Sequence, residues 1–219
     1  MNFIIIIFEL LRMSAVGLQK GVFYKPSGVK LASYLESLGP IFTKFGQLLS
    51  TRTDILDTKT AKELETLTDN CKPFRVDILK KIVVSELGDS IENIFESFDE
   101  EPLAAASLAQ VHSAVLKNGN QVVIKVLRPN IEKKVKRNLR LLKAAAKIFS
   151  YLYKESYRLK PNDVVLDYQS TIMKELDLRL EASNTNLTRK NFIDSNELYI
   201  PEVYWDLTTC LLYTSPSPR

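Results

Sequence analysis

The stretch Gln121-Val122-Val123-Ile124-Lys125-Val126-Leu127 decides the fold class, because it places one lysine near the end of a β-branched run. Asn118-Gly119 stands just before it, and residues 111–116 form another alternating stretch before that. Asn-Gly between two apolar runs predicts a β-hairpin whose two central turn residues both take positive φ. Lys125 is therefore predicted on the second strand of a hairpin.

A loop rich in alanine, residues 102–109, leads into this predicted hairpin. A kinase-type small lobe holds the phosphates of ATP with a loop, a hairpin and a Val-Val-Ile-Lys lysine in this order. The alternative is a surface lysine that closes an ordinary strand, since short strings of this kind are common.

Composition narrows the function classes. The chain has 219 residues, of which 45% are hydrophobic and 26% charged, as in an ordinary globular protein. A net charge of +4 is too small to imply nucleic acid. The two cysteines, Cys71 and Cys210, form no C-x-x-C pair, which suits a reducing compartment and predicts no metal site. A single histidine, His112, nearly excludes His-based zinc or triad chemistry.

The N-terminal segment, residues 1–26, begins apolar but is interrupted by Glu9 and Arg12. Its apolar run is too short to span a bilayer, and it lacks the basic start and cleavage site of a signal peptide. We expect a docking or membrane-surface helix, or a buried one.

Periodicity predicts several helices in the rest of the chain. Residues 27–57 form two helices around a Gly39-Pro40 break, and the second presents Lys44 and Gln47 on its polar face. Further helices are expected over 59–68, 76–87, 131–151 and 163–191, and a strand from about residue 199 to 205.

Two of these helices carry charged groups of interest. In the helix over 131–151, one face gathers the basic residues Lys133, Lys136, Arg137, Arg140, Lys143 and Lys147. This face suits anionic lipid or an acidic partner, or it is only the solvated side of a packed helix. No aromatic side chains interleave with it, which argues against nucleic acid. In the helix over 163–191, Asp177 and Glu181 are expected on one face.

Four strings together resemble a known family from about Leu38 to Asp206. They are Lys44-Phe45-Gly46-Gln47, then Ala104-Ala105-Ala106-Ser107, then Lys125, and finally Glu175-Leu176-Asp177 followed by Glu181. In this order they resemble the UbiB/ADCK/AarF family of atypical kinase-like proteins, and within it the bacterial UbiB-like members. The resemblance implies an α+β fold: a protein-kinase-like small lobe, with a short antiparallel sheet plus helices, and a family-specific helical N-terminal extension.

The resemblance also implies the site. Lys125 would bridge ATP phosphates while Glu181 fixes its position. The loop residues Ala104, Ala105, Ala106 and Ser107 replace a glycine-rich loop, and their backbone N–H groups can still point at phosphate. Lys44 and Gln47 would point into the cleft near Glu175 and Asp177. These four residues are the expected catalytic group. The cofactors implied are ATP and Mg²⁺, with most metal ligands expected in a large lobe that follows in the family, and no metal ligand is assigned in this chain.

We expect four parts in the chain. Residues 1–26 are the apolar docking segment, 27–93 the helical extension with the Lys-x-Gly-Gln motif, 94–207 the small lobe, and 208–219 a tail that resembles foreign read-through sequence. Without a large lobe, the chain alone is expected to be inactive.

The full-length protein is expected to be an ATPase or small-molecule kinase that supports ubiquinone biosynthesis. Its expected partners are nucleotide, quinone-biosynthesis enzymes or lipid precursors, and an anionic membrane surface, but no nucleic acid. Its expected location is the cytoplasm, peripheral at the inner face of the bacterial inner membrane. One alternative is a non-catalytic nucleotide- or lipid-binding scaffold for quinone-synthesis enzymes, and another is a helical membrane-surface or partner-binding module.

Overall fold

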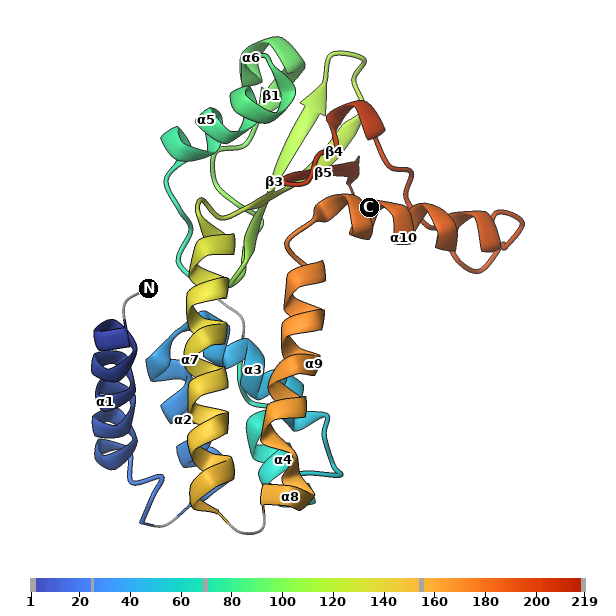
Figure 1. Cartoon of the computed structure of the whole chain (residues 1–219). Helices are drawn as coiled ribbons and strands as arrows, with labels where there is room; N and C mark the ends of the chain where they lie inside the picture. The colour runs from blue at the N-terminus through green and yellow to red at the C-terminus, as the bar shows by residue number, and fades with distance from the viewer. Residues whose placement is uncertain (1–2, 25, 69–70, 154–155, 218–219) are drawn as a thin grey trace. The chain divides into compact units, whose positions relative to one another are not determined.

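The computed structural model describes residues 3–24, 26–68, 71–153 and 156–217 (Figure 1). These residues form two compact units. The helical unit comprises Met1–Asp69 and Glu132–Ile172, and the sheet unit comprises Asn70–Ile131 and Met173–Arg219. This division differs from the four expected parts: residues 76–93 belong with the sheet, and residues 132–172 belong with the N-terminal helices.

In the part of the chain that the structure describes, the helical unit contains seven helices or parts of helices. They are α1 (Phe3–Gln19), α2 (Gly28–Leu38), α3 (Pro40–Ser50), α4 (Thr58–Leu64), α8 (Ser156–Leu159) and most of α7 (Ile131–Leu152) and α9 (Pro161–Lys174). The predicted Gly39-Pro40 break is confirmed: Gly39 takes a φ of 109° and Pro40 occupies the first turn of α3. Proline fits there because the first amides of a helix have no partner within the helix.

Side-chain oxygens cap two of these helices. Ser27 accepts from Lys30 N at 3.3 Å at the start of α2, and Asp57 accepts from Thr60 N at 3.0 Å at the start of α4. Both side chains satisfy amides that the first helical turn leaves without a carbonyl partner. The starts of α2 and α4 are thereby fixed by local sequence.

The core of the helical unit contains a buried tyrosine with a hydrogen-bonded hydroxyl. Tyr168 of α9 is 1% exposed, and its hydroxyl donates to Ile41 O of α3 at 2.6 Å. Phe45 packs against the Tyr168 ring at a centroid distance of 5.2 Å. This contact joins α3 to a helix that follows more than a hundred residues later.

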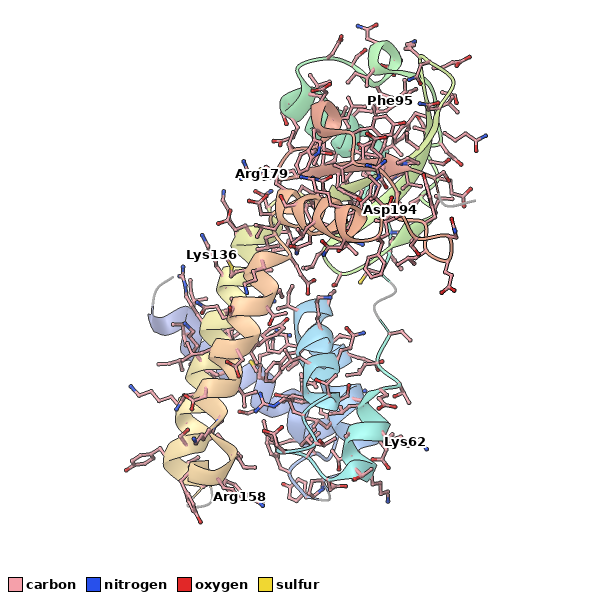
Figure 2. All side chains as sticks on the ribbon, turned by 90° about the vertical axis from the view of Figure 1, so that its right-hand side faces the viewer. Lys62, Phe95, Lys136, Arg158, Arg179 and Asp194 are labelled. Carbon is pink, nitrogen blue, oxygen red and sulfur yellow. The ribbon has the colours of Figure 1, made fainter. Side chains whose placement is uncertain are left out.

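The basic face of α7 is exposed, as its periodicity predicts. All six basic residues named for this helix are exposed, while Val135 and Leu139 on the other side are buried. Figure 2 shows Lys136 projecting outward from the helix. In α1, Met13 is buried, but Phe8 and Leu11 are exposed. Among the described residues, no helix is long and apolar enough to cross a membrane.

The sheet unit is built on an antiparallel sheet, which confirms the predicted α+β class. Its strands are β1 (Phe95–Phe98), β2 (Ala104–Ala105), β3 (Ala109–Leu116), β4 (Gln121–Leu127) and β5 (Leu212–Pro216). They run in the order β1-β3-β4-β5, and β2 also pairs with β3. The remaining elements are α5 (Val76–Leu87), α6 (Ile91–Ile94), α10 (Leu178–Asn191) and the 3₁₀ turn η1 (Trp205–Leu207).

One face of the sheet forms the core of this unit. Val122, Ile124 and Val126 of β4 are each no more than 2% exposed, and they belong to one cluster with Leu79 and Val83 of α5. Figure 2 shows Phe95, another member, inside the unit. Helix α5 therefore belongs to the sheet unit because its apolar side completes this core.

The predicted hairpin is confirmed, but its turn differs from the prediction. Gly119 N donates to Leu116 O at 2.8 Å and Leu116 N to Asn120 O at 2.9 Å. Gly119 has a φ of 83°, whereas Asn118 is not among the described residues with positive φ. The expectation of positive φ at both central residues was therefore wrong. The turn matches the three-residue type, in which a glycine in the left-handed region follows a type I turn.

The expectation of a single helix over residues 163–191 was also wrong. Helix α9 ends at Lys174 and α10 begins at Leu178, and between them Asp177 is extended, with φ −125° and ψ 99°. Its side chain accepts from Arg179 N at 3.1 Å and so caps α10. An aspartate that caps a new helix cannot also occupy the interior of a continuous one.

The strand expected over 199–205 is absent from the described structure, where these residues are irregular and enter η1. Pro201 within the stretch cannot donate to a strand ladder. The strand comes later, in the segment 208–219. Tyr213, Thr214 and Ser215 of β5 are buried, and Tyr213 pairs with Lys125. The foreign origin of this segment stays a prediction.

Candidate functional site

Lys125 of β4 and Glu181 of α10 form an ion pair within the sheet unit. Lys125 Nζ lies 2.7 Å from Glu181 Oε2 and 2.9 Å from Oε1. Because successive residues of a strand point to opposite faces, Lys125 points away from the face that buries Ile124 and Val126. The two side chains are 33% and 43% exposed, so the pair remains accessible to a ligand.

The position of Glu181 follows from how α10 begins. Asp177 caps the helix, and Leu178 and Ala182 are buried at 1% and 0% exposure. Glu181 lies three residues after Leu178, so it projects beside this buried side of the helix. A carboxylate is thereby held over a lysine that is 56 positions earlier in the chain.

The Ala-rich loop (Ala104, Ala105, Ala106 and Ser107) lies in the same part of the sheet as Lys125. Ala104 pairs with Val111 of β3, and Val111 pairs with Lys125 on its other side. Neighbouring strands lie about 4.8 Å apart, so the loop begins about two strand spacings from the lysine. Ala106 N donates to Ala109 O at 2.8 Å, which makes the loop a tight turn between β2 and β3.

Asp177 and Glu175 lie in the break between α9 and α10, close in sequence to Glu181. Arg179 holds the Asp177 carboxylate from its side chain, with Nη2 at 2.8 Å from Oδ2 and Nε at 3.0 Å from Oδ1. The hydrogen bond from Arg179 lowers the pKa of Asp177 below its ordinary value. Figure 2 shows Arg179 at the start of α10. Glu175 is half-buried.

Lys44 and Gln47 lie on α3 of the helical unit, on either side of the buried Gly46. Gln47 Nε2 donates to Leu67 O at 3.0 Å, which fastens α3 to the chain that follows α4. Lys44 is half-buried. That these two side chains reach a cleft beside Glu175 and Asp177 stays a prediction.

Metal ligands do not gather in the part of the chain that the structure describes, where no group of three or more His, Cys, Asp or Glu side chains could hold an ion. His112 is fully buried, and burial lowers its pKa. It is therefore a structural residue within β3 rather than a ligand.

Sequence reasoning did not single out Arg128, which contacts the Ala-rich loop, or Gln110, which lies on the strand after it. Arg128 Nε donates to Ala106 O at 2.8 Å, and Gln110 Oε1 accepts from Phe74 N at 3.0 Å. The sequence does hold a signal for Arg128: it is a long cation directly after the strand that carries Lys125 and directly before Pro129.

Residues 66–215 of the sequence match the ABC1 atypical kinase-like domain, whose described part contains Lys125, Glu181 and the Ala-rich loop. The chain belongs to the ABC1 atypical kinase-like family. The resemblance found in the sequence motifs is thereby confirmed, because three of the four motifs lie in the matched region.

Proteins named "Probable protein kinase UbiB" are similar to this ABC1-family chain. The protein from Shewanella baltica (strain OS185) is 45% identical over 198 residues, which are 90% of this chain and 36% of that protein. The protein from Cellvibrio japonicus (strain Ueda107) is 49% identical over 181 residues, or 83% of this chain and 33% of that protein. The chain thus spans about a third of the length of these relatives.

A solved structure supports the fold of this ABC1-family chain. Rv3197 from Mycobacterium tuberculosis, in complex with erythromycin, matches with a TM-score of 0.57 at 20% sequence identity. The match covers 100% of this chain and 51% of that one. It shows a shared fold.

Proposed function

We propose that this chain is the ATP-binding small lobe of an atypical kinase-like protein, with the helical extension that precedes it. The observation that carries the proposal is the Lys125–Glu181 ion pair, at 2.7 and 2.9 Å and open to solvent. A kinase-type small lobe uses such a pair to hold a lysine beside the nucleotide phosphates.

In this proposal Lys125 supplies the positive charge and Glu181 its position. An ammonium is a compact cation with three donors, so it can contact Glu181 and phosphate oxygens together. The Ala-rich loop contributes backbone N–H groups on the next strands, although Cβ atoms restrict how closely the chain can wrap a phosphate. Bound nucleotide would bring the group that is transferred, and this chain would orient it.

Four more residues belong to the proposed machinery. Glu175 and Asp177 precede α10, and Lys44 and Gln47 come from the signature on α3. We propose that they contact nucleotide or its Mg²⁺, with the remaining metal ligands supplied by a large lobe. Asp177 suits this role because Arg179 keeps it ionised.

We further propose that the whole protein is an ATPase or small-molecule kinase that supports ubiquinone biosynthesis, peripheral at the cytoplasmic face of the inner membrane. The UbiB names of its relatives support this proposal. So does the exposed basic face of α7, which suits anionic headgroups.

Calorimetric titration of the 219-residue chain with Mg²⁺·ATP tests nucleotide binding. Lys125→Met should weaken binding at least about tenfold, since it removes a charged contact to phosphate. Glu181→Gln should weaken it less, because the ammonium remains. Lys81→Met on α5 and Glu96→Gln on β1 are matched controls at exposed positions. Equal affinity in wild type and Lys125→Met would overturn the proposal.

ATP turnover by a longer protein that carries this chain and a large lobe separates the enzyme from the scaffold alternative. Asp177→Asn should keep nucleotide binding and abolish turnover if the protein is an enzyme. A wild-type protein that binds ATP, turns none over and still supports quinone production would favour the scaffold.

A further inference from the structure

The Ala-rich loop is held by a segment that precedes the sheet. In sequence, this entry segment (residues 71–74) follows α4 and precedes α5. Cys71 N donates to Ala105 O at 2.9 Å, and Phe74 N donates to Gln110 Oε1 at 3.0 Å. The entry segment is therefore bonded both to the loop and to the strand that follows it.

Arg128 joins the loop and the entry segment through one side chain. Its Nε donates to Ala106 O at 2.8 Å, and its Nη2 donates to Lys72 O at 2.9 Å. The guanidinium carbon lies 5.9 Å from the centroid of the Phe74 ring, within cation–π range. Its backbone N–H donates to Leu108 O at 2.8 Å.

This arrangement needs an arginine rather than any cation. Two carbonyls from different segments are reached by two nitrogens of one planar group, whose geometry is fixed. A lysine has a single nitrogen on a flexible stem, so it can reach one of the carbonyls but does not hold both in a fixed relation.

Holding these carbonyls also orients amides of the loop. A trans peptide unit is planar, with its N–H directed opposite to its C=O. When Ala106 O points to Arg128, the direction of Ser107 N–H in the loop is set. When Leu108 O accepts from Arg128 N, the direction of Ala109 N–H at the start of β3 is set as well. In the proposed function, loop amides of this kind meet the phosphates.

We propose that Arg128 is a positioning residue for the nucleotide site: it fastens the Ala-rich loop to the entry segment and thereby sets the direction of the loop amides. The inference rests on the proposed function, because it assigns the loop to phosphate. Arg128 itself need not touch the nucleotide, so its loss acts through the loop.

Affinities for ATP, ADP and adenosine test the role. Arg128→Met should weaken ATP and ADP binding about tenfold, the size expected when charge-assisted hydrogen bonds that hold a binding loop are lost. It should leave adenosine binding unchanged, because adenosine has no phosphate. Arg128→Lys should be intermediate. Arg75→Met, an exposed arginine next to the entry segment, is the matched control and should change none of the three.

If Arg128 has only a structural role, the three nucleotide and nucleoside affinities change in a different pattern. If Arg128→Met weakens adenosine as much as ATP, or if it weakens neither, the positioning role is overturned. If the wild-type chain binds no nucleotide, the proposed function fails, and the phosphate-directed part of this inference fails with it.

Amide hydrogen exchange of the nucleotide-free chain tests separately whether Arg128 holds the Ala-rich loop to the entry segment. The amides of Cys71 and Phe74 in the entry segment, of Leu103 just before the loop and of Ala106 within it are all hydrogen-bonded. In Arg128→Met they should exchange faster together, while the β3–β4 ladder keeps wild-type protection. Unchanged exchange in both segments would show that Arg128 does not fasten them, whatever the nucleotide result.

Discussion

Gln110 Nε2 lies 2.8 Å from His112 Nε2, and both side chains are buried on the same face of β3. His112 Nδ1 lies 2.9 Å from Asp99 O, a carbonyl that can only accept. Nδ1 therefore carries the proton, and Nε2 accepts from Gln110. Gln110 in turn accepts from Phe74 N through Oε1. These hydrogen bonds together define one tautomer of a neutral His112 imidazole.

We predict that His112 is neutral at pH 7, with its proton on Nδ1. Burial lowers its pKa, while the hydrogen bond and the charge of Asp99 act in the opposite direction with smaller effect. A second proton would point at the amide NH₂ of Gln110, and turning that amide would leave Phe74 N without its acceptor. Because the chain has one histidine, ¹⁵N chemical shifts of its imidazole report this tautomer directly. A protonated Nε2 at pH 7 would contradict it.

The same group predicts how stability depends on pH. Its pKa in the folded chain lies below the ordinary value of about 6.5, so the unfolded chain takes up a proton first as the pH falls. The stability that His112 contributes is complete above about pH 6.5 and declines as the pH falls below that value. Urea unfolding between about pH 5 and 8 should show the decline, and His112→Gln should remove its slope, although that variant is less stable overall. Equal slopes in the two proteins would contradict the prediction.

The Lys125–Glu181 pair is predicted to matter little for stability. Its side chains are 33% and 43% exposed, and screened pairs of this kind contribute about 0–1 kcal/mol. Lys125→Met and Glu181→Gln should therefore change the free energy of unfolding by less than about 1 kcal/mol, measured by urea denaturation at pH 7. A loss of several kcal/mol would mean that the pair holds the sheet together, and any loss of ATP binding would then have a structural explanation.

Features with a local cause could be predicted from the sequence. The hairpin around Lys125 follows from Asn118-Gly119 between two apolar runs, and the break at Gly39-Pro40 follows from backbone chemistry. Lys125 itself could be named because it stands near the end of a β-branched run. The pairing with Glu181 came only from the family resemblance, since no local pattern joins two residues so far apart.

Features that depend on packing could not be predicted. The apolar periodicity of residues 163–191 continues through Asp177, but the chain uses Asp177 to cap a second helix, which then buries Leu178. The place of α5 in the sheet unit depends on Leu79 and Val83 meeting β4. Likewise, the polar face on which the sequence places Gln47 does not reveal that its amide bonds to Leu67 O.

Asp177 has a structural task that can be separated from its proposed catalytic one. It caps α10 by accepting from Arg179 N, and asparagine caps a helix about as well as aspartate. We predict that Asp177→Asn leaves the free energy of unfolding within about 0.5 kcal/mol of wild type, whereas Asp177→Ala costs about 1 kcal/mol. Urea denaturation at pH 7 measures both.

Turnover then decides the catalytic part. In a longer protein with a large lobe, both variants should lose ATP turnover if Asp177 contacts nucleotide or its metal, because asparagine carries no negative charge. Wild-type turnover in Asp177→Asn together with a stability loss in Asp177→Ala would mean that the residue is a helix cap alone.

Gly46 is predicted to be essential for packing the signature helix α3. A Cβ atom built at this position would lie 2.7 Å from Leu35 Cδ1 and closer still to Leu67 Cδ1. Both leucines are 4% exposed, so moving either side chain disturbs the packing around it. Alanine favours a helix by about 1 kcal/mol over glycine, but overpacking a core costs about 1–3 kcal/mol. Gly46→Ala should therefore lower stability despite its better helix propensity.

Far-UV circular dichroism during thermal unfolding measures this effect, because α3 belongs to the helical unit. Glu36→Ala on α2 is the control: it raises helix propensity slightly at an exposed position and should not lower the unfolding midpoint. A Gly46→Ala midpoint at or above that of wild type would mean that Leu35 and Leu67 repack without cost. The glycine of the Lys-x-Gly-Gln signature would then need an explanation other than the close approach of α3 to α2 and the chain after α4.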